Sequence, residues 1–228
     1  MASTPRRRES RPALNRARVL QGAVRVADER GASSVSMRKV AEELGVEAMS
    51  LYHHVTGKDE ILDGIVDLVF AEIEMPGDAT GWRDAMRRRA SSARAALLRH
   101  PWALGLMDSR RTPGPATLTH HDWMIGCLRG AGFSLRKTAR AVSALDGYVY
   151  GFVLQESSLP FRTPEELEGV AAAMVDAFPD EGYPHLTEMI QAHALSPGYD
   201  YADEFMPGLD LILDGLEALR PAPDDPLT

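Results

Sequence analysis

The sequence predicts an all-α protein in which a small N-terminal domain of three helices precedes a larger helical domain. Apolar residues recur at the i, i+3, i+4 spacing of a helix face through most of the 228 residues, and no segment sustains the alternation of a half-buried strand. Glycines and prolines separate the periodic segments, as expected at the ends of helices. A hydrophobic content of 44% is sufficient for a buried core.

The first domain is expected over residues 13–74. Ser36 is a suitable N-cap, because its hydroxyl can accept a hydrogen bond from the first free N–H groups of a helix. Gly31 and Gly45 allow the backbone conformations that end helices and form tight turns. The three expected helices cover residues 14–30, 36–43 and 47–53, and a longer helix that packs on them is expected to follow over residues 59–73.

A Met-Pro-Gly-Asp break at residues 75–78 marks the boundary to a second domain over residues 75–220. Its expected helices cover residues 82–99, a short segment after Pro101, and residues 116–131, 135–155, 164–178, 185–194 and 201–219. The two ends lack apolar periodicity. We expect residues 1–12, which contain four arginines, to form a disordered basic arm, and residues 221–228 to form a flexible tail.

Charge is distributed unevenly along the chain. The net charge is −8, but residues 1–60 hold 11 Lys and Arg against 8 Asp and Glu, and the remainder is strongly acidic. Basic charge at one end is expected of a nucleic-acid-binding module joined to an acidic partner domain. Two ordinary solvated surfaces could also differ in this way, so charge alone does not decide.

The sequence also bears on the cellular location of the protein. No apolar run is long enough to cross a membrane, and polar residues follow the arginines near the start where a signal peptide would be apolar. We therefore expect a soluble protein in the cytoplasm. Cys127 is the only cysteine, which excludes an internal disulfide, and its apolar neighbours predict a buried, inert thiol.

Residues 36–62 form the motif on which the functional interpretation rests. They read SMRKVAEELGVEAMSLYHHVTGKDEIL: a short helix, a turn that contains a glycine, and a second short helix. Apolar positions such as Val40, Leu44 and Leu51 lie on the inward side of both helices. This pattern predicts a helix-turn-helix, whose second helix enters the major groove of DNA.

The motif resembles the DNA-binding domain of the TetR family of transcriptional regulators, in particular its tetracycline repressor branch. The resemblance continues through RAALLRH at residues 94–100, GFSL at 132–135, GLDLI at 208–212 and GLE at 215–217. It implies a repressor that binds a palindromic operator as a homodimer and is released by a small hydrophobic effector. The alternative is a helical small-molecule-binding protein or enzyme without specific DNA binding.

By this resemblance, seven residues contact DNA. Arg38 faces the major groove, where its guanidinium can bond a guanine, and Met49 can contact thymine methyl groups. Lys58 lies beside the N-terminus of the following helix, which favours phosphate. The alternative is an ordinary solvated helix face and, for Tyr52, a half-buried core aromatic. The seven are Arg38, Ala48, Met49, Ser50, Tyr52, His54 and Lys58. Ala48 stands where the tetracycline repressor has glutamine, so the operator should differ.

The resemblance also implies an apolar effector pocket in the second domain. Aromatic and thioether side chains suit such a pocket, although each is individually more common in a plain core. The implied residues are Trp102, Leu106, Met107, Trp123, Tyr148, Phe152 and Gln155. Met107 and Gln155 occupy positions that hold a magnesium-coordinating pair in the tetracycline repressor. A thioether and a neutral amide do not suit this cation, so we expect no metal and no cofactor.

Two apolar stripes are implied to form a four-helix dimer interface. One, on the expected last helix, comprises Phe205, Leu209, Ile212, Leu216 and Leu219, and the other comprises Ala139, Val142, Leu145 and Val149. Both stripes could instead face the core of their own chain. A helix-turn-helix protein recognises one half-site per subunit, so recognition of palindromic DNA supports a dimer.

An enzyme is the main rival from another class. The pairs His53-His54 and His120-His121 attract attention, but adjacent helical residues diverge by about 100° and cannot chelate as an i, i+4 pair does. We expect both pairs to be exposed. The sequence contains no nucleophile elbow, phosphate-binding glycine loop or paired-cysteine motif. We therefore expect no catalytic residues.

Overall fold

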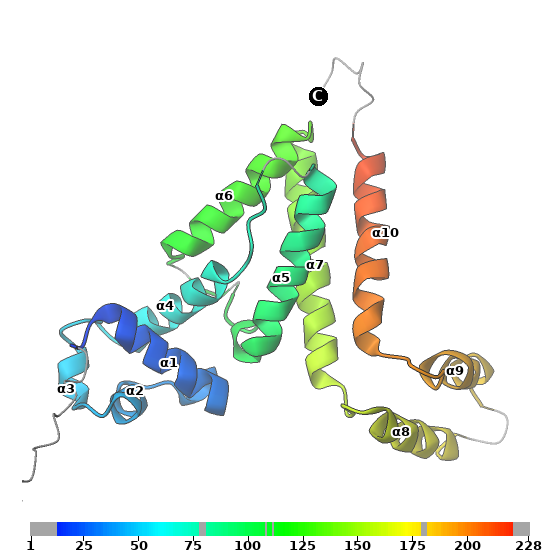
Figure 1. The fold of residues 1–228 in the computed structure, drawn as a ribbon, viewed down its shortest axis with the longest axis horizontal. Helices are drawn as coiled ribbons and strands as arrows, with labels where there is room; N and C mark the ends of the chain where they lie inside the picture. Colours follow the sequence, from blue (N-terminus) through cyan, green and yellow to red (C-terminus); the bar gives the residue numbers. More distant parts are fainter. Residues whose placement is uncertain (1–12, 78–80, 108, 111, 179–181, 221–228) are drawn as a thin grey trace, which may run out of the picture.

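The computed structural model describes residues 13–77, 81–107, 109–110, 112–178 and 182–220. Within these ranges the chain forms only helices, turns and loops, which confirms the all-α prediction (Figure 1). The expected basic arm and C-terminal tail lie outside the described residues. The α-helices are α1 (Arg16–Arg30), α2 (Met37–Leu44), α3 (Ala48–Leu51), α4 (Lys58–Ala71), α5 (Trp82–Arg99), α6 (Pro115–Gly130), α7 (Leu135–Ser158), α8 (Pro164–Asp176), α9 (Pro184–Met189) and α10 (Phe205–Ala218).

Local sequence signals begin and end the N-terminal helices. Asn15 caps α1 by accepting a hydrogen bond from the backbone N–H of Arg18, and Ser36 caps α2 in the same way through Lys39. Gly45 ends α2 in the left-handed conformation, with φ of 66°. The short α3 ends at Leu51, two residues before the predicted end, because the chain turns there and returns Val55 to the core.

The buried residues form two cores, and α4 contributes to both. Its first half, through Ile61 and Ile65, packs with α1, α2 and α3. Its second half, through Val69 and Phe70, packs with the helices of the second domain. Trp102, next to Pro101 in a short 3₁₀ segment (Pro101–Ala103), also packs against both cores. Helix α4 therefore belongs to both cores and connects the two halves of the molecule.

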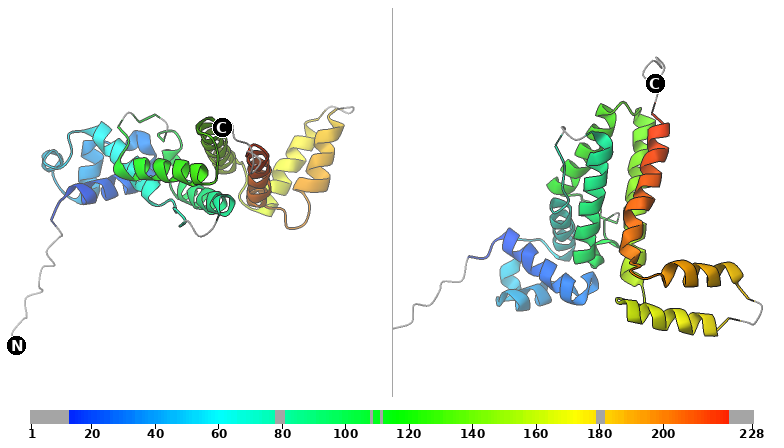
Figure 2. Two further views of the ribbon diagram at one scale, coloured as in Figure 1. Left: turned by 90° about the horizontal axis from the view of Figure 1, so that it is seen from above. Right: turned by 45° about the vertical axis from the view of Figure 1, so that its right-hand side comes forward.

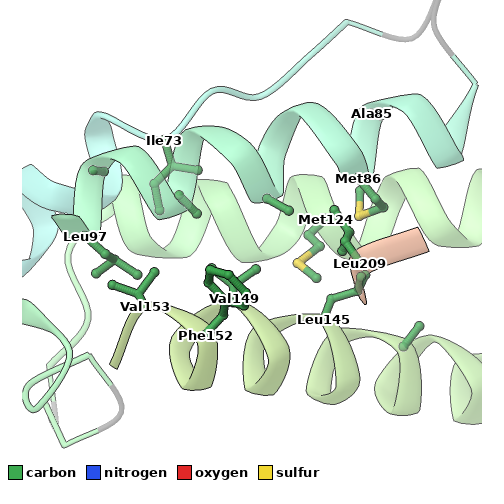
Figure 3. Packing of buried hydrophobic residues seen from close by; sticks show 14 of the residues in the cluster. Ile73, Ala85, Met86, Leu97, Met124, Leu145, Val149, Phe152, Val153 and Leu209 are labelled. Carbon is green, nitrogen blue, oxygen red and sulfur yellow. The ribbon is translucent and has the colours of Figure 1, made fainter. Parts of the chain in front are cut away.

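The second core lies between α5, α6, α7 and α10. Met86 of α5, Met124 of α6 and Leu145 of α7 are fully buried and point toward one another (Figure 3). Helix α10 runs alongside α7 (Figure 1). Helices α8 and α9 extend away from these four helices as a separate hairpin (Figure 2). None of the described helices is long and apolar enough to cross a membrane.

The expectation that the two apolar stripes face a second copy is wrong for most of their residues. Leu145, Val149, Phe205, Leu209 and Leu216 are buried in the core of their own chain. Periodicity identified an apolar face on each helix correctly, but α7 and α10 turn these faces toward α5 and toward each other.

The region before α10 also differs from the predicted continuous helix over 201–219. Residues Tyr201–Glu204 form a 3₁₀ turn, in which the Asp200 carboxylate accepts a hydrogen bond from the backbone N–H of Ala202. Helix α9 continues as a π-helical turn over Ile190–Ala194. Both segments were expected to be helical, and local hydrogen bonding determined the type of turn.

Candidate DNA interface and ligand cavity

Burial divides the helix-turn-helix into an anchored side and an open side. Val40, Leu44, Leu51 and Val55 are buried between α1 and α4. None of the seven predicted DNA-contacting residues is buried: Arg38, Met49, Tyr52 and Lys58 are exposed, and Ala48, Ser50 and His54 are partly exposed. They lie on the first turns of α2, on α3 and the turn after it, and at the start of α4. Tyr52 is 51% exposed, so it is not a core aromatic.

One acidic side chain of α2 forms ion pairs with two basic side chains at the start of the same helix. Glu42 accepts hydrogen bonds from Arg38 Nε at 2.9 Å and from Lys39 Nζ at 3.0 Å. These two bonds, with that from Lys39 the larger cause, lower the pKa of the Glu42 carboxyl. The i, i+3 and i, i+4 spacing of these three residues could have signalled the cluster from sequence, but Lys39 and Glu42 were not singled out.

A second carboxylate fixes the turn before α4. Glu60 accepts from the backbone N–H of Thr56 at 2.7 Å and from Arg16 Nε at 3.1 Å. The Thr56 bond, followed by that from Arg16, lowers the pKa of Glu60. This arrangement joins α1 to the segment that carries Lys58, the first residue of α4. Lys58 is thus held at the helix N-terminus, as the sequence predicted.

Six of the seven residues proposed from sequence to bind the effector lie in or against the second core. Met107 and Phe152 are buried in the second core, and Gln155 is exposed, where its side-chain oxygen accepts from the Tyr201 hydroxyl at 2.8 Å. The Tyr148 hydroxyl donates to the Phe205 carbonyl at 2.8 Å. Trp102, Leu106, Trp123 and Tyr148 are partly buried and pack against the same core.

Trp123 lines a cavity of about 540 Å³. This cavity lies between the first turns of α5, the second half of α6 and the loop at Pro76, to whose carbonyl the Trp123 indole N–H donates at 3.2 Å. Cys127 also lines it and is only half-buried, which corrects the expectation of a fully buried thiol. Other lining residues include Trp82, Ala85, Gly126 and Arg220.

A buried polar cluster lies next to this cavity. Arg89 Nε donates to His120 Nε2 at 3.1 Å, and Arg89 Nη2 lies 2.6 Å from Asp146 Oδ1. Arg89 and His120 are each 1% exposed. Burial, and secondarily the Arg89 charge, lowers the pKa of His120 to about 3, so the imidazole is neutral.

The expectation that His120 is exposed is therefore wrong. Helix α6 packs on α4 and α5, and the ring of His120 lies against that of Phe70, with centroids 5.3 Å apart. The sequence could not show this, because a histidine pair on a helix carries no signal of which neighbour is covered. His121 is partly exposed.

The two halves of the molecule meet at His100, the C-cap of α5. Its Nδ1 lies 2.7 Å from Asp28 Oδ1 of α1, and its Nε2 lies 3.1 Å from Glu72 Oε1 at the end of α4. The Trp102 indole N–H also donates to Asp28 Oδ1, at 2.7 Å. The Asp28 carboxylate is thus shared by two side chains of the second half.

Comparison with known families identifies both halves. Residues 19–65 match the family described as "Bacterial regulatory proteins, tetR family", and residues 75–220 match "Tetracyclin repressor-like, C-terminal domain". The chain is 34% identical over 222 residues to the HTH-type transcriptional repressor DrrR1 of Streptomyces coeruleorubidus, covering 93% of this chain and 80% of that protein. It is 29% identical over 209 residues to the class D tetracycline repressor protein of Escherichia coli, and the match covers 90% of this chain and 89% of that protein.

Solved structures agree with this assignment. Streptomyces coelicolor ActR in complex with actinorhodin superposes with a TM-score of 0.73 at 27% identity, covering 90% of this chain and 98% of that one. The exposed helix-turn-helix, the shared helix α4 and the helical second domain are thus features of a known fold. The chain belongs to the TetR family of transcriptional regulators.

Proposed function

We propose that this regulator is a repressor that binds a palindromic operator as a homodimer and leaves it when a small organic effector enters the second domain. The observation that carries the proposal is the helix-turn-helix with its apolar side buried and its predicted contact residues open. We propose domains over residues 13–74 and 75–220 and a cytoplasmic location. The proposed function includes no catalytic step.

The proposed DNA contacts divide into two kinds. Arg38, Ala48, Met49 and Ser50 read base edges, because the first turns of a recognition unit point into the major groove. Tyr52, His54 and Lys58 bind phosphates and position the domain. Glu42 bonds only Nε of Arg38, so the Nη groups of the guanidinium can donate to a base while this ion pair is kept.

The proposed dimer uses the outer faces of α7 and α10. Leu154 of α7 is 58% exposed and Leu211 of α10 is 75% exposed in the single chain. Gly147 and Gly215, also exposed, have no atom within 4 Å of where a Cβ would stand, so the backbones there are open to close approach. Exposed leucines beside small residues favour burial against a second copy.

The proposed route from effector to DNA passes through α6 and α4. Asp67 of α4 accepts hydrogen bonds from the Thr117 backbone N–H at 2.8 Å and from its hydroxyl at 3.0 Å, at the start of α6. A shift of α6 around a bound effector therefore moves α4, and α4 in turn forms part of the helix-turn-helix core. In a dimer this changes the separation of the two recognition helices.

Operator selection tests the proposal. The purified full chain is incubated with random-sequence duplexes, and bound DNA is amplified through repeated rounds. We expect enrichment of an inverted repeat bound by two copies, with affinity that falls as salt rises. Failure to enrich any palindrome would overturn the repressor proposal. The enriched duplex then serves as the probe for release by compounds.

A further inference from the structure

The buried cluster beside the cavity contains hydrogen-bond donors without acceptors. His120 Nε2 accepts from Arg89 Nε, so in the neutral ring the proton is on Nδ1. No acceptor for this Nδ1–H is present in the described part of the chain. Arg89 Nη1 likewise has no hydrogen-bond partner among the described residues, and Arg89 Nη2 and Asp146 Oδ1 are in contact only as an ion pair, 2.6 Å apart. His120 Nδ1 and Arg89 Nη1 are shielded from solvent, so the cost of leaving them unpaired is not relieved by bulk water.

The position of these donors relates them to the cavity. Ala85 lines the cavity and precedes Arg89 by one turn of α5. Trp123 lines it and follows His120 by one turn of α6, with ring centroids 6.4 Å apart. The donors therefore lie one helical turn beyond the cavity wall on both helices, with the Trp123 indole alongside.

The chemistry of the cluster indicates which group of a ligand would pair with its free donors. Two donors from different helices, one of them on a cation, are best matched by a group with two acceptor oxygens. Asp146 already balances the charge of Arg89.

We propose that the effector is an aromatic carboxylic acid whose rings occupy the cavity beside Trp123 and whose carboxylate accepts hydrogen bonds from Arg89 and His120. The inference rests on the proposed function, because it describes the ligand of the proposed effector site. It narrows the expected hydrophobic effector to one with an acidic group.

Binding of 1-naphthoate and of neutral 1-acetylnaphthalene, which has the same rings and a single carbonyl acceptor, tests the proposal. Quenching of tryptophan fluorescence and calorimetry report both affinities in the full chain. We expect 1-naphthoate to bind more tightly by about tenfold or more, as for hydrogen bonds to a charged group.

Substitutions test whether the preference for 1-naphthoate arises from the Arg89–His120–Asp146 cluster. His120→Phe removes the Nδ1 donor and keeps the Arg89–Asp146 pair, and Arg89→Met combined with Asp146→Leu removes both charges together. Either should abolish the preference for 1-naphthoate. His121→Phe is the matched control, because His121 Nδ1 already bonds the Thr117 carbonyl at 2.8 Å. It should keep the preference. If the double variant does not fold, His120→Phe and its control still decide the matter.

Two results would overturn the inference. One is that the wild-type chain shows no preference for 1-naphthoate over 1-acetylnaphthalene. The other is a preference that survives in His120→Phe. A chain that enriches a palindrome but shows either result retains the repressor proposal and loses only this one.

Discussion

His100 at the end of α5 and Asp28 of α1 are joined by a 2.7 Å contact between Nδ1 and Oδ1 that connects the second domain directly to the helix-turn-helix unit. The Trp102 indole donates to the same carboxylate oxygen. Two side chains of the effector domain thus share one acceptor in the DNA-binding domain.

Removing this acceptor should weaken the coupling between effector and operator. We expect Asp28→Ala to retain effector binding, measured by tryptophan quenching, while more effector is needed to release the selected operator in an electrophoretic assay. The neighbouring Glu29→Ala is the control, since Glu29 is exposed and its carboxylate lies 3.8 Å from Arg30 of the same helix. Unchanged release by Asp28→Ala would show that the junction does not transmit the signal.

Arg38 and Lys58 should affect DNA binding differently. Arg38→Ala should reduce binding to the selected operator by about 1–3 kcal/mol and relax specificity at one base pair. Lys58→Ala should weaken binding to all sequences alike and lower the salt dependence, as expected for a lost phosphate contact. Competition assays against operator variants at several salt concentrations measure both effects. Identical behaviour of the two variants would contradict the division of roles.

Glu42→Gln should strengthen DNA binding. The substitution removes the carboxylate that holds Arg38 and Lys39 and would repel phosphate. We expect tighter binding at low salt and a smaller difference at high salt, where such charges are screened. Glu43→Gln is the control, because Glu43 pairs with Arg25 of α1 at 2.6 Å. Weaker binding by Glu42→Gln would mean that Glu42 positions Arg38 for DNA.

Leu211→Asp should separate the dimer. Leu211 makes little contact within its own chain, so the fold should persist and circular dichroism should be unchanged. A charge at a buried interface position is strongly unfavourable, and sedimentation should show monomers with weakened operator binding. Leu118→Asp, on an exposed position of α6, should stay dimeric. Dimers of Leu211→Asp would place the interface elsewhere.

Gly64→Ala should destabilise the N-terminal core. A Cβ on Gly64 of α4 would lie 2.6 Å from Cδ2 of Leu20, which is itself buried in α1. Overpacking of this kind costs about 1–3 kcal/mol of unfolding free energy, measurable by urea titration. Gly169→Ala in α8 meets no atom within 4 Å and should not lower stability. An unchanged free energy of unfolding in Gly64→Ala would mean that α1 and α4 can move apart enough to fit the added methyl group.

The sequence by itself determined the helical class, the family and the exposure of the recognition residues. Helix ends are set by local chemistry, as at Ser36 and Gly45, and the first turns of a helix-turn-helix remain open because its apolar side must face α1 and α4. These features need only short-range patterns or a known motif to be recognised.

Only the tertiary structure decided which neighbours cover each helix face. The stripe through Phe205 and Leu209 was visible in the sequence, but whether it meets a second copy or its own α5 and α7 depends on how the helices cross. The Arg89–His120–Asp146 cluster joins α5, α6 and α7, whose residues in it are far apart in the sequence. In the sequence each of these three polar residues looks like an ordinary surface residue. Their burial results from packing between helices, which the residue types alone do not reveal.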